Sequence, residues 1–169
     1  MNLGALNILV VDDNHHMRIL LRQTLRGLGV GEVLEAGDGA EGLQVMRSHP
    51  VDIVMTDYAM APLDGADFVN LIRKSPDSAN PMIPVIMVTA YSTAARVAEA
   101  RDVGVNEILV KPITTRGVMD RLIRVIDYPR AFVRTDDYFG PDRRRRGSGS
   151  AHGGPFRRAT DPAPTPAER

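Results

Sequence analysis

Three aspartates stand at the ends of two apolar segments, and their carboxylates are the first candidates for chemistry. Asp12 and Asp13 follow the run ILVV, and Asp57 follows the run DIVMT. A carboxylate is costly inside a buried strand, but at a strand's exit it is available to a site. If the two segments form neighbouring parallel strands, the three carboxylates converge and repel one another unless a cation neutralises them. Mg²⁺ prefers such oxygen ligands and also binds phosphate oxygens, so the pattern indicates a magnesium site.

Two further polar residues stand at the ends of later apolar segments. Thr89 ends PVIMVT, and Lys111, one of only two lysines in the chain, follows EILV directly before Pro112. Each residue alone has an ordinary explanation, because strand-end Asp residues often cap helices, Thr hydroxyls bond locally and Lys is usually solvated. Together, however, an oxygen nucleophile, a cation site, a hydroxyl and an ammonium are the parts that phosphoryl transfer requires.

The elements that must position these residues alternate between strand and helix. Apolar runs predict five strands, over 7–11, 32–36, 52–56, 84–89 and 107–110, each followed by helical periodicity. Such a pattern indicates a parallel sheet covered on both faces, with too few repeats for an eight-fold barrel. The sequence therefore predicts an α/β fold of the flavodoxin-like type, a doubly wound five-stranded parallel sheet of order 2-1-3-4-5 with five helices. Its strand order reverses between the first and third strands, where the three aspartates stand.

Several residues predict where helices begin and end. Asp12 or Asn14 could cap the first helix, and Gly29 suits its C-terminal end. Ser92 or Thr93 could begin the helix over 94–104, and Thr114 or Thr115 the helix over 116–126.

A glycine-rich segment offers a competing site. GDGAEG, with Gly37, Gly39 and Gly42, fits the dinucleotide-binding pattern, and Asp57 lies where a ribose-binding acid belongs. However, the strand before it is predicted to lie at the sheet's edge, away from the reversal point at which ligands bind in such sheets. We therefore interpret the segment as a tight turn from strand to helix.

The bulk composition excludes several classes of protein. The chain has 169 residues, no cysteine and equal numbers of basic and acidic residues, 21 each, so net charge implies no particular partner and no disulfide can form. The N-terminus lacks the basic region of a signal peptide, and no apolar stretch approaches the roughly 20 residues that span a bilayer. We expect a cytoplasmic protein without a membrane partner.

The motifs ILVVDDN, DIVMTDYAMAPLDG, VIMVTAYS and ILVKP resemble those of response regulator receiver domains, the two-component family that includes the chemotaxis response regulator. The resemblance covers residues 6–127. It implies that Asp57 accepts a phosphoryl group, and that Asp12, Asp13, Asp57 and the Ala59 backbone carbonyl hold Mg²⁺. It also implies that Thr89 bonds a phosphoryl oxygen, that Lys111 pairs with the phosphoryl group or Asp57, and that the Lys111–Pro112 bond is cis.

Two positions near Lys111 and Thr89 bear on how such a domain would switch. The family often carries Tyr or Phe three residues before the lysine, and here that residue is Ile108. The usual inward rotation of an aromatic ring is therefore not expected at this position. Tyr91 could contribute instead, although a loop tyrosine exposed to solvent is the simpler expectation.

The composition changes after Tyr128, which predicts a receiver domain over 1–128 and a largely disordered tail over 129–169. Gly and Pro make up 11 of the last 41 residues, too polar a segment to bury much apolar surface. Yet 131–146 interleaves aromatic residues with arginines, and three of the four Phe (Phe132, Phe139 and Phe156) lie beyond Tyr128. Three interpretations remain open: a linear motif that docks on a partner or on the receiver, a solvated basic run, and, least expected, a nucleic-acid contact.

The resemblance implies a phosphorylation-dependent switch rather than an enzyme acting on other substrates. A histidine kinase or histidine phosphotransfer protein would supply the phosphoryl group, and an effector protein would bind one state. A phosphotransfer shuttle or phosphate sink is the alternative within the family. A more distant alternative is an aspartyl-phosphate phosphatase of the haloacid-dehalogenase type with Asp12 as nucleophile, although Asn14 stands where that class requires a second acid.

Overall fold

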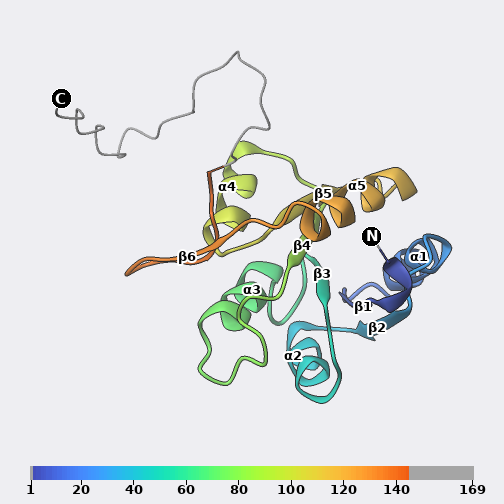
Figure 1. Cartoon of the computed structure of the whole chain (residues 1–169), viewed down its shortest axis with the longest axis horizontal. Coiled ribbons are helices and arrows are strands. Elements are labelled where there is room, and N and C mark those ends of the chain that lie inside the picture. The colour runs from blue at the N-terminus through green and yellow to red at the C-terminus, as the bar shows by residue number, and fades with distance from the viewer. Residues whose placement is uncertain (1, 145–169) are drawn as a thin grey trace, which may run out of the picture.

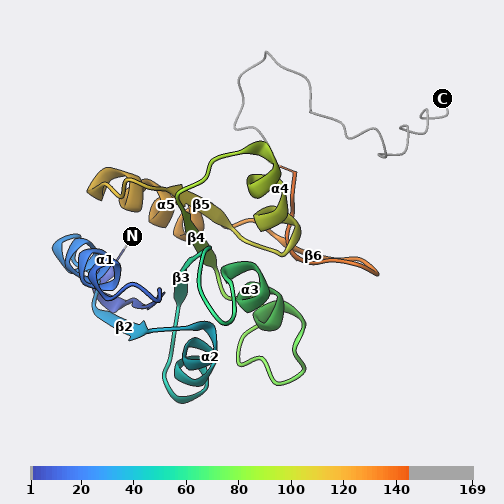
Figure 2. The same cartoon turned by 180° about the vertical axis from the view of Figure 1, so that it is seen from behind.

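The computed structural model describes residues 2–144, and its centre is a five-stranded parallel sheet in the predicted order β2-β1-β3-β4-β5. The strand bounds are Asn7–Val11 (β1), Glu32–Ala36 (β2), Ile53–Asp57 (β3), Val85–Thr89 (β4) and Glu107–Val110 (β5). Strand β3 ends one residue later than expected, because Asp57 still pairs with Val88 of β4. Figures 1 and 2 show helices on both sides of this sheet.

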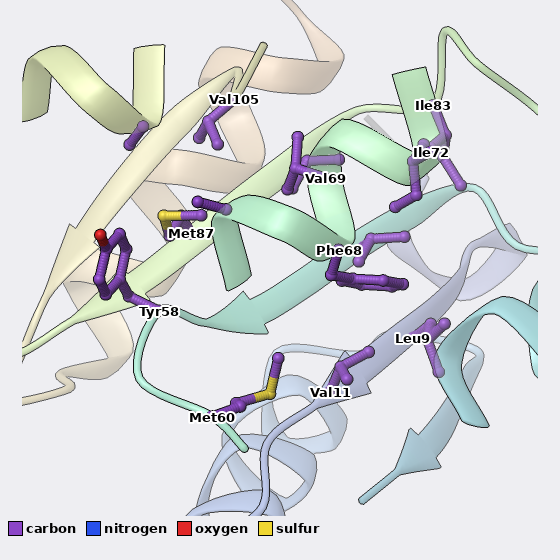
Figure 3. Packing of buried hydrophobic residues seen from close by; sticks show 14 of the residues in the cluster. Leu9, Val11, Tyr58, Met60, Phe68, Val69, Ile72, Ile83, Met87 and Val105 are labelled. Carbon is purple, nitrogen blue, oxygen red and sulfur yellow. The ribbon is translucent and has the colours of Figure 1, made fainter. Parts of the chain in front are cut away.

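Two separate cores lie on the two faces of the sheet. The helices of the described part are α1 (His15–Gly27), α2 (Gly39–Ser48), α3 (Gly65–Lys74), α4 (Ala94–Asp102) and α5 (Thr115–Ile126), with a short 3-10 turn over Leu3–Ala5. Because successive strand residues point to opposite faces, Ile8 packs with residues of α1 and α5, whereas Leu9 packs with residues of α2 and α3. Phe68 of α3 is fully buried over the second face (Figure 3).

The helix ends confirm signals read from the sequence. Asn14, Thr93 and Thr114 are the N-cap residues of α1, α4 and α5, and each side-chain oxygen accepts a backbone N–H of the first turn. These bonds satisfy donors that a helix cannot satisfy internally. Gly29 follows α1 with a φ of 88°, in the left-handed region that glycine adopts without strain.

The glycine-rich segment forms the tight turn that we expected, between the edge strand β2 and α2. The Asp38 side chain accepts the Glu41 N–H at 2.8 Å, and Glu41 in return accepts the Gly37 N–H at 2.6 Å. A Cβ on Gly42 would lie 3.0 Å from Phe68 Cζ, so this glycine allows α2 to approach the core. Helix capping and close packing therefore account for the motif.

A β-hairpin follows α5, where we expected a largely disordered segment. Strands β6 (Phe132–Arg134) and β7 (Phe139–Pro141) pair antiparallel, and β7 lies against α3. Of the three interpretations left open for 131–146, docking on the receiver is the one that these strands fit, because the centre of the Phe132 ring lies 5.0 Å from the Arg73 guanidinium carbon. Both views show the hairpin running beside α3 and α4 (Figures 1 and 2).

The rest of the predicted tail lies outside the described residues. This concerns residues 145–169, and with them Phe156 and the last two positions of the 131–146 segment. The division into a domain over 1–128 and a tail over 129–169 accordingly stays a prediction. Within residues 2–144, no helix is long and apolar enough to cross a membrane.

Candidate functional site

The three aspartates meet where the strand order reverses. Asp12 and Asp13 follow β1, and Asp57 ends the neighbouring strand β3. One carboxylate oxygen from each lies within 4.8 Å of the other two. Asp12 and Asp57 are buried and Asp13 is exposed, so the cluster opens to solvent on one side.

Hydrogen bonds hold the Asp12 backbone and one of its carboxylate oxygens in place. The Asp12 N–H bonds to the Ala36 carbonyl at 3.2 Å, which extends the β1–β2 ladder by one residue. Asp12 Oδ1 accepts the Asn14 N–H at 2.8 Å, and the Asp12 carbonyl accepts a bond from Arg18 Nη1 at 2.7 Å. These bonds orient the carboxylate toward the cluster before any ligand arrives.

Asp12 also carries the clearest sign of a cation site. Its Oδ2 is buried and has no hydrogen-bond partner among the described residues. Burial raises the pKa of this carboxyl above its ordinary value, and the Asp57 and Asp13 charges raise it further, against the Asn14 N–H and Lys111. A hard divalent cation would satisfy the orphaned oxygen and offset the repulsion, and carboxylate oxygens are the ligands it prefers. The donor set therefore fits Mg²⁺.

Lys111 supplies the only ammonium that the described residues place in this cluster. It follows β5, and its Nζ lies 2.8 Å from Asp57 Oδ1. Its backbone N–H bonds to the Thr89 carbonyl at 2.8 Å, which ties the start of the loop to β4. The Lys111–Pro112 bond is cis. One ammonium faces three carboxylates, so the site stays negative overall and attractive to a cation.

Thr89 lies at the end of β4, but its hydroxyl bonds locally. Thr89 Oγ1 accepts the Tyr91 N–H at 3.1 Å and donates to the Tyr91 carbonyl at 3.3 Å. The hydroxyl is therefore engaged with the loop that leads into α4. Ala59 lies two residues after Asp57 in the loop that follows β3 and is exposed.

Ile108 and Tyr91 border a small hollow beside Thr89, whose lining also includes Tyr58, Met87, Val97 and Ala100. Ile108 is half-buried, and Tyr91 is 60 % exposed, as expected for a loop tyrosine. The branched aliphatic side chain at 108 contributes no ring to this hollow.

The sequence did not predict a polar network that lies next to Asp57. Tyr58, the residue after Asp57, is buried and donates its hydroxyl to Glu99 of α4 at 2.7 Å. Arg96 of α4 bonds to the same hydroxyl and stacks over the Tyr58 ring at 4.7 Å. Burial raises the Tyr58 pKa, and the Glu99 carboxylate raises it further. The only sequence signal was an aromatic residue directly after a candidate nucleophile, because its partners lie about 40 residues away.

Comparison with known proteins agrees with this geometry. The response regulator receiver domain matches residues 8–123. The chain is 33 % identical to the chemotaxis protein CheY of Pseudomonas aeruginosa over 122 residues, which cover 72 % of this chain and 97 % of that protein. It is 36 % identical to the Helicobacter pylori chemotaxis protein CheY1 over 118 residues, 69 % of this chain and 94 % of the other.

Solved structures show the same relation. The high-resolution structure of Vibrio cholerae CheY4 superposes with a TM-score of 0.66 at 30 % identity, and the match covers 72 % of this chain and 98 % of that one. The matched family segment ends before the β6–β7 hairpin, which is therefore an addition to the shared fold. The chain belongs to the response regulator receiver domain family, the signalling domains of two-component systems.

Proposed function

We propose that this chain is a phosphorylation-dependent switch that accepts a phosphoryl group on Asp57. The observation that carries the proposal is the convergence of Asp57, two further carboxylates and the Lys111 ammonium at the reversal of strand order. Such a site combines an oxygen nucleophile with cationic partners for phosphoryl oxygens. Asp12 is the weaker candidate for the acceptor, because the Lys111 ammonium, which could bind phosphoryl oxygens, pairs with Asp57 and not with Asp12.

The donor would be the phosphohistidine of a histidine kinase or phosphotransfer protein. An Asp57 carboxylate oxygen attacks phosphorus, the P–N bond breaks, and the imidazole leaves with its electron pair. Mg²⁺ held by Asp12, Asp13, Asp57 and the Ala59 carbonyl would neutralise charge on the phosphoryl oxygens. Water later cleaves the acyl phosphate, which returns the carboxylate and releases inorganic phosphate.

Lys111 and Thr89 would couple the phosphoryl group to the surrounding structure. Lys111, now paired with Asp57, is placed to follow the added phosphoryl oxygens as a point charge. Thr89 would exchange its local bonds with Tyr91 for a bond to a phosphoryl oxygen, which would pull on the loop before α4. Ile108 has no aromatic ring that could rotate in response. Tyr91 lies in the loop before α4, so its ring would move together with that loop. An effector protein would distinguish the two states.

Acetyl phosphate with Mg²⁺ tests the acceptor directly. We expect mass spectrometry to show one added phosphoryl group, lost when EDTA removes the metal and absent in Asp57→Asn. Borohydride reduction followed by peptide mapping locates the acyl phosphate. A label on Asp12, or incorporation that survives Asp57→Asn, would contradict the proposal, and the former would favour the phosphatase alternative.

A second experiment separates a switch from a phosphate shuttle or sink. Lys111→Ala should still accept phosphate at Asp57, more slowly, but lose most of the amide chemical-shift response around Thr89 and Ile108. A pull-down with and without a phosphoryl mimic on Asp57 then shows whether an effector prefers one state. A full wild-type shift pattern in Lys111→Ala would refute the role given to the lysine.

A further inference from the structure

Helix α4 is held to the domain by few apolar contacts. Ala100 is its only buried residue, whereas α3 buries six of its ten residues. Polar contacts at both ends of α4 supplement this packing. Arg96 in its first turn and Glu99 in its second turn bond to Tyr58, and its last residue, Asp102, pairs with Arg143 at 2.9 Å. A helix attached in this way can move with little loss of core packing.

Arg143 lies two residues after the last strand of the hairpin, and the hairpin packs against other parts of the receiver. A Cβ on Gly140 would lie 2.9 Å from Gly104 Cα, so the two backbones are in close contact. Phe132 stacks on Arg73, a buried arginine of α3 that donates to the Gly104 carbonyl at 2.9 and 3.1 Å. The hairpin is thus fixed to α3 and to the turn before β5.

The Arg143 side chain is held in place on the hairpin side. Its guanidinium carbon lies 4.4 Å from the centre of the Tyr138 ring, and the Tyr138 hydroxyl donates to the Pro141 carbonyl at 2.7 Å. A cation positioned by stacking loses less side-chain entropy when it forms an ion pair than a freely rotating one does.

We propose that the β6–β7 hairpin is a latch that holds the end of α4 through Arg143 and Asp102, and that phosphorylation of Asp57 works against this latch. This inference rests on the proposed function. Arg96, in the first turn of α4, bonds to Tyr58, the residue directly after the phosphoacceptor, and the loop before α4 is bonded to the Thr89 hydroxyl. A nine-residue helix moves largely as one body, so a pull at its start strains the Arg143–Asp102 contact at its end.

The latch biases the switch in a defined direction. It stabilises the position that α4 adopts beside unmodified Asp57, so it lowers the population of any state in which α4 has moved. Relatives that end where the family match ends lack this restraint. The β6–β7 hairpin therefore opposes the conformational response to phosphorylation. Weakening its contact with α4 should make the unphosphorylated protein behave more like the phosphorylated one.

Charge reversal tests the contact itself, with amide hydrogen exchange of Ala94–Asp102 as the readout. The ion pair is partly exposed, so Arg143→Glu or Asp102→Lys should accelerate exchange in unphosphorylated α4 about two- to five-fold. The double variant, which restores opposite charges, should return toward wild type. Arg144→Glu is the matched control, since it makes the same charge change on the neighbouring residue, and should leave α4 exchange unchanged.

Gly140→Val tests the hairpin as a unit. Its added carbons would clash with the Tyr138 side chain and with the Gly104 backbone, and would unseat the hairpin while the Arg143 residue itself is kept. We expect at least as large a rise in α4 exchange as in Arg143→Glu, with exchange in α1 unchanged. Unchanged α4 exchange in both variants would overturn the latch.

The coupling to phosphorylation has its own readout. With acetyl phosphate and Mg²⁺, wild-type α4 exchange should rise, and it should rise less in Arg143→Glu because part of the restraint is already gone. If Asp57 incorporates phosphate normally but the effects of phosphorylation and of Arg143→Glu on α4 exchange simply add, the coupling would be overturned and the latch would not. Absence of incorporation would overturn the proposed function and the coupling together, while the unphosphorylated comparison would still decide whether the latch exists.

Discussion

Replacing Lys111 with methionine isolates the electrostatic role of its ammonium. Lys111 Nζ lies 2.8 Å from Asp57 Oδ1, and the Lys111 and Asp57 side chains are 25 % and 7 % exposed. Methionine keeps most of the length and apolar character of the side chain but removes the charge. Asp57 would then remain buried beside Asp12 and Asp13 without the ammonium.

The size of the effect follows from burial and from what replaces the lost cation. Removing one partner of a fully buried ion pair costs about 3–5 kcal/mol, whereas a charge-assisted hydrogen bond is worth about 1.5–3 kcal/mol. Because Lys111 is a quarter exposed, we expect Lys111→Met to lower the free energy of unfolding by about 2 kcal/mol without metal. Bound Mg²⁺ would supply the missing positive charge, so the loss should shrink to about 1 kcal/mol at saturating Mg²⁺.

Urea unfolding in EDTA and in millimolar Mg²⁺ measures this difference. Circular dichroism is the suitable signal because the chain has no tryptophan. The other lysine, exposed Lys74 at the end of α3, offers a matched control, and Lys74→Met should change stability little in either buffer. The same destabilisation of Lys111→Met in both buffers would refute the idea that the ammonium and the metal neutralise the same carboxylates.

Three further predictions concern buried polar groups. Because burial raises the Asp12 pKa, the free energy of unfolding without metal should fall as the pH rises from below the ordinary Asp pKa through the raised one. In urea titrations across pH, Asp12→Asn should flatten this fall and should raise the free energy of unfolding by about 1 kcal/mol at neutral pH. Tyr58→Phe keeps the ring but loses the bond to Glu99, so urea unfolding should show a loss of about 1 kcal/mol, and wild-type stability would contradict the bond's importance. Arg73→Lys cannot reproduce the guanidinium's bonds to three different acceptors, and calorimetry should show about 2–4 kcal/mol of destabilisation; a smaller loss than that of Tyr58→Phe would contradict this reasoning.

Local patterns were sufficient for most of the fold. Five apolar runs of strand length, separated by helical periodicity, determine a parallel sheet because each strand must be buried on both faces. Cap residues such as Asn14 and Thr93 act within three residues of their own position, so they can be read directly from the chain. The convergence of Asp12, Asp13 and Asp57 also followed, since strand order alone brings these strand ends together.

Contacts between distant residues were beyond such patterns. Nothing near Tyr58 indicates that its hydroxyl bonds to Glu99, 41 positions later, or that Arg73 is buried against Gly104. The two strands of the hairpin were not predicted for the same reason, although docking of 131–146 on the receiver was one open interpretation, because a polar, glycine-containing segment orders only where a complementary surface offsets its entropy.

The sequence by itself determined the topology, the edge at which the site lies and the residue types that meet there, because these depend on periodicity and on where each strand ends. Only the tertiary structure decided the state of each group. It turns the Thr89 hydroxyl toward Tyr91, leaves Asp12 Oδ2 without a hydrogen-bond partner within residues 2–144, and packs the hairpin against the receiver. These features depend on side-chain rotamers and on the shapes of facing surfaces, which exist only once the elements have packed.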